Sequence, residues 1–190
     1  SFHLLVDEIY HGLHYVDDLP SVLEIDDSAF VVNSFSKYFG MTGWRLGWIV
    51  VPDYAVDKAS ILAQNFYISP SSIAQHAALA GFTAATCLIL EQRRQNFRER
   101  RDFLCASLRE IGFVLAEEVQ GAFYVYADIS AFSENSEQFC HDMLENHGVA
   151  ITPGTDFGDF KARQFVRFAF TTSMDDLALG VERLRRALQG

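Results

Sequence analysis

Three short and almost continuously apolar runs in the first third of the chain constrain its fold most strongly. They span residues 4–6, 29–33 and 44–51, and Pro52 closes the last of them. Each run has the length of a strand and lacks the apolar–polar alternation of a half-exposed strand. Runs of this kind are typical of a sheet that is covered on both faces, as in α/β folds. We therefore predict an α/β arrangement for the start of the chain.

Helix signals follow the third run. Asp53 is predicted to cap a helix that ends near residue 65. Ser69 and Pro70 are the residue types preferred at an N-cap and at a first helical position, so a second helix is predicted from there to about residue 83. Residues 85–111 are predicted to form one long helix with an apolar stripe along one side.

After Gly112 the pattern changes to that of a small α+β unit. Ser173 and Asp176 have the spacing of a capping box, and they are predicted to open a last helix that ends near residue 188. Between these points we predict two strands around Gln120-Gly121, a helix, a short strand with a turn, and a further strand, over residues 113–129, 136–146, 148–154 and 164–172. We divide the chain into residues 1–85, an α/β piece, and residues 86–190, a long connecting helix with a small α+β domain.

The charge balance bears on the partners of the chain. Its 190 residues include 25 acidic and 15 basic side chains, which give a formal net charge of −10. This charge argues against binding to nucleic acid or to an anionic membrane, because both favour basic surfaces. No apolar run approaches the roughly 20 residues that a membrane-spanning helix needs. We therefore expect no nucleic-acid partner and no membrane.

Cysteine and histidine give no sign of a disulfide framework or a metal site. Cys87, Cys105 and Cys140 are odd in number and far apart, so we interpret them as reduced thiols in a cytoplasmic protein. His11 and His14 are three residues apart, but we identify no third ligand for such a pair, and we expect no metal there.

The segment "SFSKYFGMTGWRLGW", residues 34–48, directly follows the second predicted strand. Ligands of α/β sheets bind beyond the carboxyl ends of the strands, so polar side chains there are candidates for a site. Desolvation of a lysine such as Lys37 favours the neutral, nucleophilic amine. Arg45 suits bidentate binding of a phosphate, and Ser34 and Ser36 offer hydroxyl groups to the same anion. The alternative is a surface turn with a solvated lysine.

A second polar cluster, Asp7 and Tyr10, follows the first predicted strand in "LLVDEIY". A buried carboxylate at this place needs a cationic partner, because an unpaired buried charge is unfavourable. Taken alone, this cluster favours a turn or a helix cap over a binding site. A lysine, an aspartate and a phosphate-binding arginine together are what pyridoxal phosphate requires of a protein.

The two clusters together resemble class I/II aminotransferases, which are fold-type I pyridoxal-phosphate enzymes. "SFSKYFGMTGWRLGW" closely resembles the cofactor-lysine motif of that family, whose serine, lysine and arginine fall on Ser34, Lys37 and Arg45. "DEIY" resembles the segment whose aspartate meets the ring nitrogen and whose tyrosine meets the phenolic oxygen of the cofactor. The resemblance assigns these roles to Asp7 and Tyr10.

The resemblance extends to the C-terminus. "GAFYVYADI" and "ITPGTDFG" resemble signatures of the small domain, and "FVRFAF" resembles the strand whose arginine binds the substrate α-carboxylate. That residue is Arg167 here, in preference to Arg163, because Arg167 lies inside the apolar run. The implied fold is the C-terminal part of the aspartate aminotransferase-like fold: a remnant of the large-domain sheet plus a small α+β domain.

The implied function is transfer of an amino group from an amino acid to a 2-oxo acid by a cytoplasmic homodimer, in amino-acid metabolism and biosynthesis. A pyridoxal-phosphate-dependent carbon–sulfur β-lyase of the same fold would use the same lysine and arginine. Family chains are close to double this length, and this chain opens on "SFHLLVDEIY" without a methionine. We therefore expect the C-terminal half of a longer protein, inactive or poorly active alone. The third reading is a non-catalytic C-terminal fragment.

The basic stretch "RRQNFRERR", residues 93–101, is an alternative candidate for a binding surface. Glu91, Glu99 and Asp102 interleave with its arginines on the predicted long helix. We interpret the stretch as helical ion pairs on a solvated face rather than as an RNA-binding patch.

Overall fold

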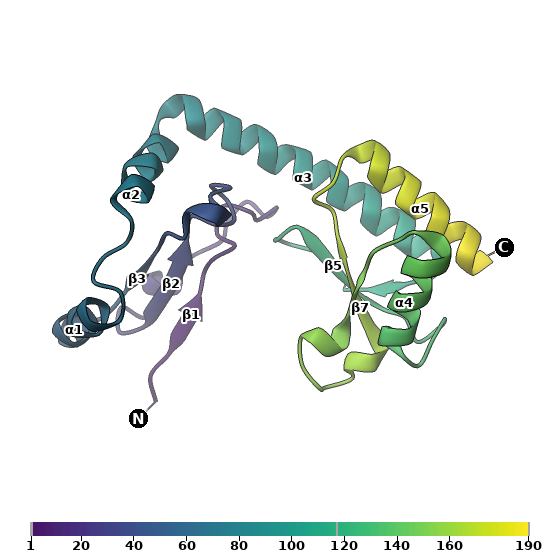
Figure 1. The fold of residues 1–190 in the computed structure, drawn as a ribbon, viewed down its shortest axis with the longest axis horizontal. Helices are drawn as coiled ribbons and strands as arrows, with labels where there is room; N and C mark the ends of the chain where they lie inside the picture. The colour runs from purple at the N-terminus through teal and green to yellow at the C-terminus, as the bar shows by residue number, and fades with distance from the viewer. Residues whose placement is uncertain (1, 117, 190) are drawn as a thin grey trace. The chain divides into compact units, whose positions relative to one another are not determined.

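The computed structural model of the chain describes residues 2–116 and 118–189. The chain divides into two compact units, Ser1–Arg94 and Gln95–Gly190. The division falls inside the long helix α3 (Ala84–Ile111), which Figure 1 shows running from one unit into the other. The predicted helix over residues 85–111 is thereby confirmed, and three apolar residues of its stripe, Leu90, Leu104 and Leu108, are buried.

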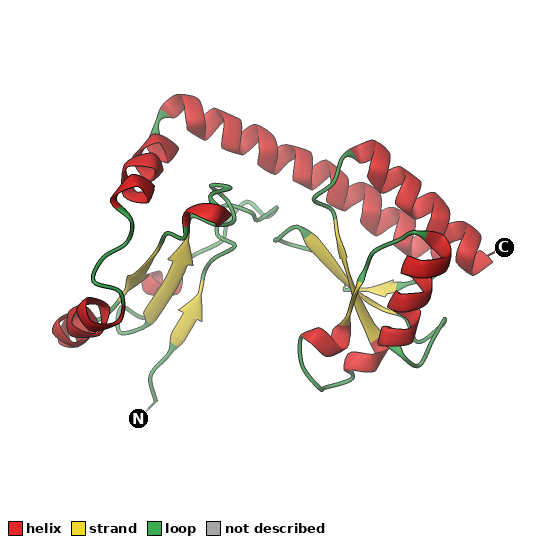
Figure 2. Cartoon of the chain, in the orientation of Figure 1, coloured by secondary structure: helices red, strands yellow, loops and turns green. Residues whose placement is uncertain are grey.

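The described part of the first unit forms a three-stranded sheet in the order β1-β2-β3 (Figure 2). The strands are β1 (Leu5–Asp7), β2 (Phe30–Ser34) and β3 (Gly47–Val50). β1 and β2 are parallel, whereas β2 and β3 are antiparallel. The third predicted run begins later than expected, because Thr42–Trp44 forms the 3-10 helix η2 and Arg45 has left-handed backbone angles.

The expectation that this sheet is covered on both faces is wrong for the described residues. All four residues of β3 are exposed, and only Val31 of β2 is fully buried among the residues of these strands. The helix α2 (Ser72–Leu79) places Ala74 and Ala78 against Phe35 and Leu46, which lie beyond the strands, rather than against the strands themselves. The apolar side chains of β3 therefore remain at the surface.

The two predicted helix starts of the first unit are displaced. Asp53 is the first residue of the 3-10 helix η3 (Asp53–Ala55) rather than a cap, and α1 (Val56–Phe66) follows with no side-chain cap at Ala55. The N-cap of α2 is Ser71, because its carbonyl accepts the amide of Gln75 at 3.1 Å. The short 3-10 helices η1 (Val22–Glu24) and η4 (Ala80–Phe82) complete the unit.

The described part of the second unit forms a four-stranded antiparallel sheet in the order β4-β5-β7-β6. Its strands are β4 (Val114–Leu115), β5 (Tyr124–Asp128), β6 (Thr152–Pro153) and β7 (Phe165–Ala169), and its helices are α4 (Ser136–His147), η5 (Gly154–Asp156), η6 (Ala162–Gln164) and α5 (Met174–Gln189). The sequence predicted this order of elements. The two strands around Gln120-Gly121 are shorter and farther apart than predicted, and residue 117 lies outside the described residues.

Alternate residues of the two central strands form the core of this unit. Val125 and Ala127 of β5 and Val166 of β7 are fully buried, as the period of two along a strand requires. Phe113, which follows α3, meets Phe168 of β7 edge-on with ring centroids 5.3 Å apart. One face of the small sheet is thus packed, as in an α+β domain.

Two helices of the second unit carry clear end signals. Ser173 Oγ accepts the amide of Asp176 at 3.1 Å and donates to its carboxylate at 2.7 Å, which confirms the predicted start of α5. These hydroxyl hydrogen bonds lower the pKa of Asp176. At α4 the Oδ1 atom of Asn135 accepts the amides of Glu137 and Gln138, and Gly148, with φ of +64°, ends the helix.

No single helix within residues 2–116 and 118–189 has both the length and the apolar composition of a membrane span. The segments Ser72–Phe82 and Ala84–Ile111 pass such a test only jointly, and they are bent by 80° relative to one another.

Truncation of the buried core should destabilise the second unit. Leu108 of α3 is 0% exposed, so we expect Leu108→Ala to lower the free energy of unfolding by about 2–5 kcal/mol through lost burial and a residual cavity. Leu144→Ala is the matched control, because Leu144 on α4 is half exposed and its loss should change stability by only about 0.5 kcal/mol. Urea unfolding followed by circular dichroism would measure both. Equal losses would contradict the described core.

Candidate active site

The parallel pairing of β1 and β2 brings the two predicted clusters to one edge of the sheet. Asp7 is the last residue of β1 and lies opposite Val32, and Ser34 is the last residue of β2. The amide of Glu8 continues the ladder by donating to the carbonyl of Val32 at 2.9 Å. The segments that follow the two strands, with Tyr10 and Lys37, therefore start from neighbouring positions.

A tight turn after β2 presents Lys37. The amide of Phe35 donates to the Leu46 carbonyl at 3.1 Å, and the amide of Met41 donates to the Phe35 carbonyl at 3.0 Å. Gly40 closes the turn by donating to the Lys37 carbonyl at 3.0 Å, with φ of +68° that a glycine adopts readily. The buried ring of Phe35 anchors this turn, and the Lys37 side chain is half-buried.

Ser34 and Ser36 form a preorganised pair of hydroxyl groups at the base of the turn. Ser34 Oγ lies 2.9 Å from Ser36 Oγ and 3.1 Å from the Leu46 carbonyl, and it accepts the amide of Ser36 at 3.0 Å. Thr42 Oγ1 donates to the Ser36 carbonyl at 2.8 Å, which ties the far end of the turn to the same point. Within residues 34–36 the two serine hydroxyl groups and the amide of Ser36 thus lie close together.

Arg45 has an unusual backbone conformation beside these serines. Its φ of 53° and ψ of 50° lie in the left-handed region, which costs a non-glycine residue on the order of 1 kcal/mol. Its guanidinium donates to the Thr42 carbonyl at 2.9 Å and is otherwise directed to the exposed side of the turn. Such strain at an arginine is typical of a functional position.

Asp7 and Tyr10 lie beside the turn, with one difference from the prediction. The ammonium nitrogen of Lys37 lies 5.9 Å from the centroid of the Tyr10 ring, so these two predicted residues are brought together. Asp7 is exposed rather than buried, and its carboxylate accepts the amide of Ile9 at 3.0 Å. Because the carboxylate keeps its hydration, it does not need the buried cationic partner that the sequence suggested.

Next to the turn lies a mainly apolar hollow of about 470 Å³. None of the predicted site residues lines it; its walls consist of His11, Gly12, Asn33, Phe35, Tyr38, Phe39, Trp48 and Phe82.

Arg167 belongs to the second unit, in the middle of β7. Its guanidinium carbon lies 4.5 Å from the ring centroid of Phe157 and 5.2 Å from that of Tyr124. Two aromatic rings thus make cation–π contacts with Arg167, and the planar group of an arginine suits bidentate binding of an anion. Arg163 is exposed in η6, outside the strand.

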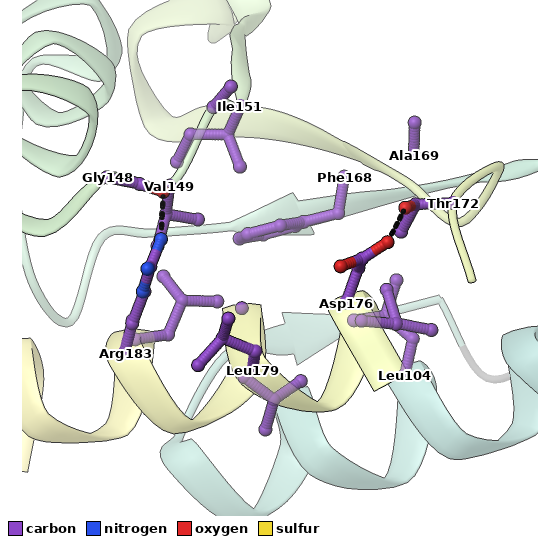
Figure 3. Close-up of a pocket in the computed structure, with 15 residues that line it drawn as sticks. Leu104, Gly148, Val149, Ile151, Phe168, Ala169, Thr172, Asp176, Leu179 and Arg183 are labelled. Carbon is purple, nitrogen blue, oxygen red and sulfur yellow. Dashed lines mark hydrogen bonds between the residues drawn. The ribbon is translucent and has the colours of Figure 1, made fainter. Parts of the chain in front are cut away.

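A second hollow, of about 350 Å³, lies in the second unit (Figure 3). Its polar groups are engaged within the fold: Arg183 donates to the Gly148 carbonyl at 2.9 Å, and Thr172 donates to Asp176 at 3.0 Å. None of the predicted site residues lines it.

His11 and His14 make contacts within the loop that follows β1. His14 Nδ1 accepts the amide of Gly12 at 3.2 Å, and burial together with the nearby charge of Arg94 lowers the pKa of His14. His11 lies 3.4 Å from the buried carboxylate of Glu8, which also accepts Ser21 Oγ at 3.0 Å. Within residues 2–116 and 118–189 no group of three or more potential ligands could hold a metal, and the three cysteines are free.

Sequence reasoning missed the contacts that α3 makes with the lysine turn. Tyr38 Oη donates to Glu91 at 2.6 Å, and Arg93 donates to the Tyr38 carbonyl. Burial and this carboxylate raise the pKa of Tyr38 to about 12. Glu91 and Arg94 also form the ion pair that their spacing predicts, at 2.7 Å. The sequence signals were only these charges, and they were assigned to a solvated face.

The groups of the first unit fit pyridoxal phosphate. The hydroxyl pair of Ser34 and Ser36 and the exposed guanidinium of Arg45 suit a phosphate, and the half-buried amine of Lys37 suits an aldehyde. The exposed carboxylate of Asp7 suits a protonated ring nitrogen.

Comparison with known proteins identifies the family. The family model described as aminotransferase class I and II matches residues 1–184, and the chain belongs to this family. A valine–pyruvate aminotransferase of Mycobacterium tuberculosis is 39% identical over 183 residues, 95% of this chain and 47% of that protein. An aspartate aminotransferase of Sulfurisphaera tokodaii is 34% identical over 189 residues, 96% of this chain and 47% of that protein.

The fold agrees with this assignment. The crystal structure of an aminotransferase from Mycobacterium tuberculosis matches with a TM-score of 0.95 and 39% identity, over 98% of this chain and 49% of that chain. The described residues have the α/β architecture of the C-terminal part of the aminotransferase fold. The chain spans about half the length of the curated relatives it matches.

The raised pKa of Tyr38 should make part of the stability depend on pH. A tyrosine in the unfolded chain titrates near pH 10 and Tyr38 in the folded protein near 12, so its contribution is complete below pH 10 and is lost as the pH rises to 12. Tyr38→Phe should therefore reduce the fall in the urea midpoint between pH 9 and about 11. Tyr54→Phe, at an exposed tyrosine, should leave that fall unchanged. The same slope for Tyr38→Phe and the wild type would contradict the described burial of Tyr38 and its hydrogen bond to Glu91.

Proposed function

We propose that the full-length protein is a pyridoxal-phosphate-dependent aminotransferase that transfers an amino group from an amino acid to a 2-oxo acid. The observation that carries the proposal is the turn after β2, where a half-buried lysine, a hydroxyl pair and a strained arginine gather at the carboxyl edge of the sheet. Membership in the aminotransferase family supports the same activity.

The proposed cofactor is held by residues of the first unit. Ser34, Ser36 and Arg45 would bind its phosphate, since charge-assisted hydrogen bonds from a guanidinium and hydroxyl donors suit that group. Asp7 would keep the ring nitrogen of the cofactor protonated, and the hydroxyl of Tyr10 would donate a hydrogen bond to the phenolic oxygen of the cofactor. When bound, pyridoxal phosphate supplies an electron sink for the carbanion of the substrate.

Lys37 is the proposed catalytic residue. Its amine would hold the aldehyde of the cofactor covalently and, once released by the incoming amino acid, would take the α-proton of the substrate at Nζ. The hydrogen bonds of the turn fix the backbone from which this side chain extends, at Gly40 and Met41. Because this backbone is fixed, the flexible side chain of Lys37 samples fewer positions before its amine reaches a reactive geometry.

Arg167 is proposed to bind the substrate α-carboxylate. The rings of Phe157 and Tyr124 hold its guanidinium in one plane, which favours bidentate pairing with a carboxylate. A homodimer and a cytoplasmic location are part of the proposal, and the family resemblance and the three free thiols support them. The exposed apolar strand β3 supports the proposal that the 190-residue chain is poorly active alone.

Reductive trapping tests the role of Lys37. The full-length protein is incubated with pyridoxal phosphate, reduced with borohydride and mapped by mass spectrometry; we expect one adduct, on Lys37. Lys37→Ala should lower kcat by about 10⁴-fold or more, because it removes both the attachment point and a proton carrier. Lys58→Ala, at an exposed lysine of α1, is the control and should retain wild-type turnover. Near-normal turnover of Lys37→Ala would refute the proposal.

The same preparation separates transamination from the lyase alternative. Amino-group transfer requires a 2-oxo acid acceptor, whereas a carbon–sulfur β-lyase releases ammonia and pyruvate without one. Acceptor-independent release would replace the proposed reaction by the lyase reaction while leaving the Lys37 adduct in place.

Exchange of Arg167 for lysine tests carboxylate binding. A point charge replaces a planar fork, so we expect Arg167→Lys to raise KM for the amino acid by about tenfold or more. Arg163→Lys, at the exposed neighbour outside β7, should leave KM within about twofold. An unchanged KM for Arg167→Lys, with normal affinity for the cofactor, would exclude Arg167 from substrate binding.

A further inference from the structure

We propose that Glu91, Arg93 and Arg94 on α3 are positioning residues that clamp the two loops of the site through Tyr38 and His14. The proposal rests on the proposed function of Lys37. Glu91, Arg93 and Arg94 are not among the residues proposed to bind the cofactor or the substrate. The proposal gives a role to the charged part of α3 that the sequence alone placed on a solvated face.

Tyr38 is the residue through which the two loops meet. It directly follows Lys37, and its ring lies against Gly12, in the loop that contains Tyr10. A Cβ atom built on Gly12 would come within 2.5 Å of Tyr38 Cγ, and Gly12 has a φ of +91°. Only a glycine permits this close approach without a shift. A movement of Tyr38 would therefore displace Lys37 and the loop of Tyr10 together.

Two charged groups of α3 hold Tyr38 from opposite ends. Its hydroxyl donates to Glu91 Oε1 at 2.6 Å, and its backbone carbonyl accepts a hydrogen bond from Arg93. The guanidinium of Arg93 also fills the space beside Gly40, where a Cβ atom would lie 3.2 Å from Nη2. The hydrogen bonds of Tyr38 with Glu91 and with Arg93 each have one charged partner, and such bonds are stronger than neutral ones.

The third member extends the clamp to the other loop. Arg94 donates to the carbonyl of His14 at 3.1 Å, and it pairs with Glu91 at 2.7 Å. A continuous chain of contacts thus runs from the Tyr38 hydroxyl through Glu91 and Arg94 to the His14 carbonyl. The hydrogen bond from Tyr38 and the charge of Arg94 lower the pKa of Glu91, so the carboxylate stays ionised at neutral pH.

These contacts differ from ordinary ion pairs on a helix surface. Pairs between exposed charges contribute little to stability. Here two of the three charges donate to backbone carbonyls of the loops that carry Lys37 and Tyr10, and the helix beneath them is anchored by the buried Leu90. Loss of the clamp is therefore expected to loosen the loops more than the protein as a whole.

Hydrogen exchange of the full-length protein without cofactor tests the clamp directly. The variants are Arg93→Ala, Glu91→Gln and Tyr38→Phe, and the readout is exchange at the amides of Gly40 and Met41, which close the lysine turn. We expect about tenfold faster exchange there in the first two variants and a smaller increase in Tyr38→Phe, because a lost charged partner opens the turn locally.

Arg100→Ala is the charge-matched control. It removes the same charge from the same helix, but Arg100 lies at the carbonyl of Thr171, in the second unit. Peptides from residues 124–128 provide an internal reference in every variant, since they lie in the core of that unit. Exchange of the turn that is no faster in Arg93→Ala than in Arg100→Ala would overturn the proposal. If Arg93→Ala fails to fold, Tyr38→Phe and Glu91→Gln decide the question by the same comparison.

A second readout separates this proposal from the proposed function. The dissociation constant of pyridoxal phosphate should rise about tenfold in Arg93→Ala, and Arg93→Lys should restore part of the affinity. If reductive trapping of the wild-type protein gave no adduct on Lys37, the proposed function would be refuted. The hydrogen-exchange comparison would still show whether the α3 residues hold the lysine turn. Faster exchange with unchanged cofactor affinity would reduce the clamp to a structural contact and would overturn its positioning role.

Discussion

Parallel pairing of β1 with β2 places the last residues of both strands at one edge of the sheet, and the part of the candidate site that lies in the first unit depends on this alignment. Asp7 and Ser34 start from that edge, and the segments after them carry Tyr10 and Lys37. In an antiparallel pair the two strand ends would lie at opposite edges. The few backbone hydrogen bonds of this short ladder therefore decide which side chains can meet.

The turn after β2 balances unfavourable backbone geometry against local anchoring. Arg45 occupies the left-handed region, which is unfavourable for a non-glycine residue, whereas Gly40 adopts its positive φ readily. Buried aromatic packing holds the turn: the rings of Phe35 and Phe39 lie 4.8 Å apart at their centroids. Strain of this kind persists only where the surroundings determine the conformation, and at this turn the surroundings include both a core cluster and charged groups of α3.

Local signals in the sequence predict much of this structure, and contacts between distant segments account for what they miss. The capping pair of Ser173 and Asp176 and the apolar stripe of α3 act over a few residues, so their elements were predicted correctly. Residue types alone predicted the N-cap of α2 at Ser69, whereas the structure has it at Ser71. The start of α2 depends on the turn between two helices, which residue types do not specify. The contacts of Tyr38 with Glu91 join residues 53 positions apart, which no short-range pattern reveals.

Local charge rather than net charge governs a site of this kind. The chain carries a formal net charge of −10, which would repel an anionic cofactor and a carboxylate substrate. Exposed charges are screened beyond about 8–10 Å at physiological salt, so distant acidic residues contribute little to the potential at the turn. Arg93 contacts the backbone of the turn and Arg45 is part of it, whereas the nearby carboxylate of Glu91 is neutralised by Arg94. The clamp on α3 would therefore hold the turn in place and add the positive charge of Arg93 beside the backbone of the turn.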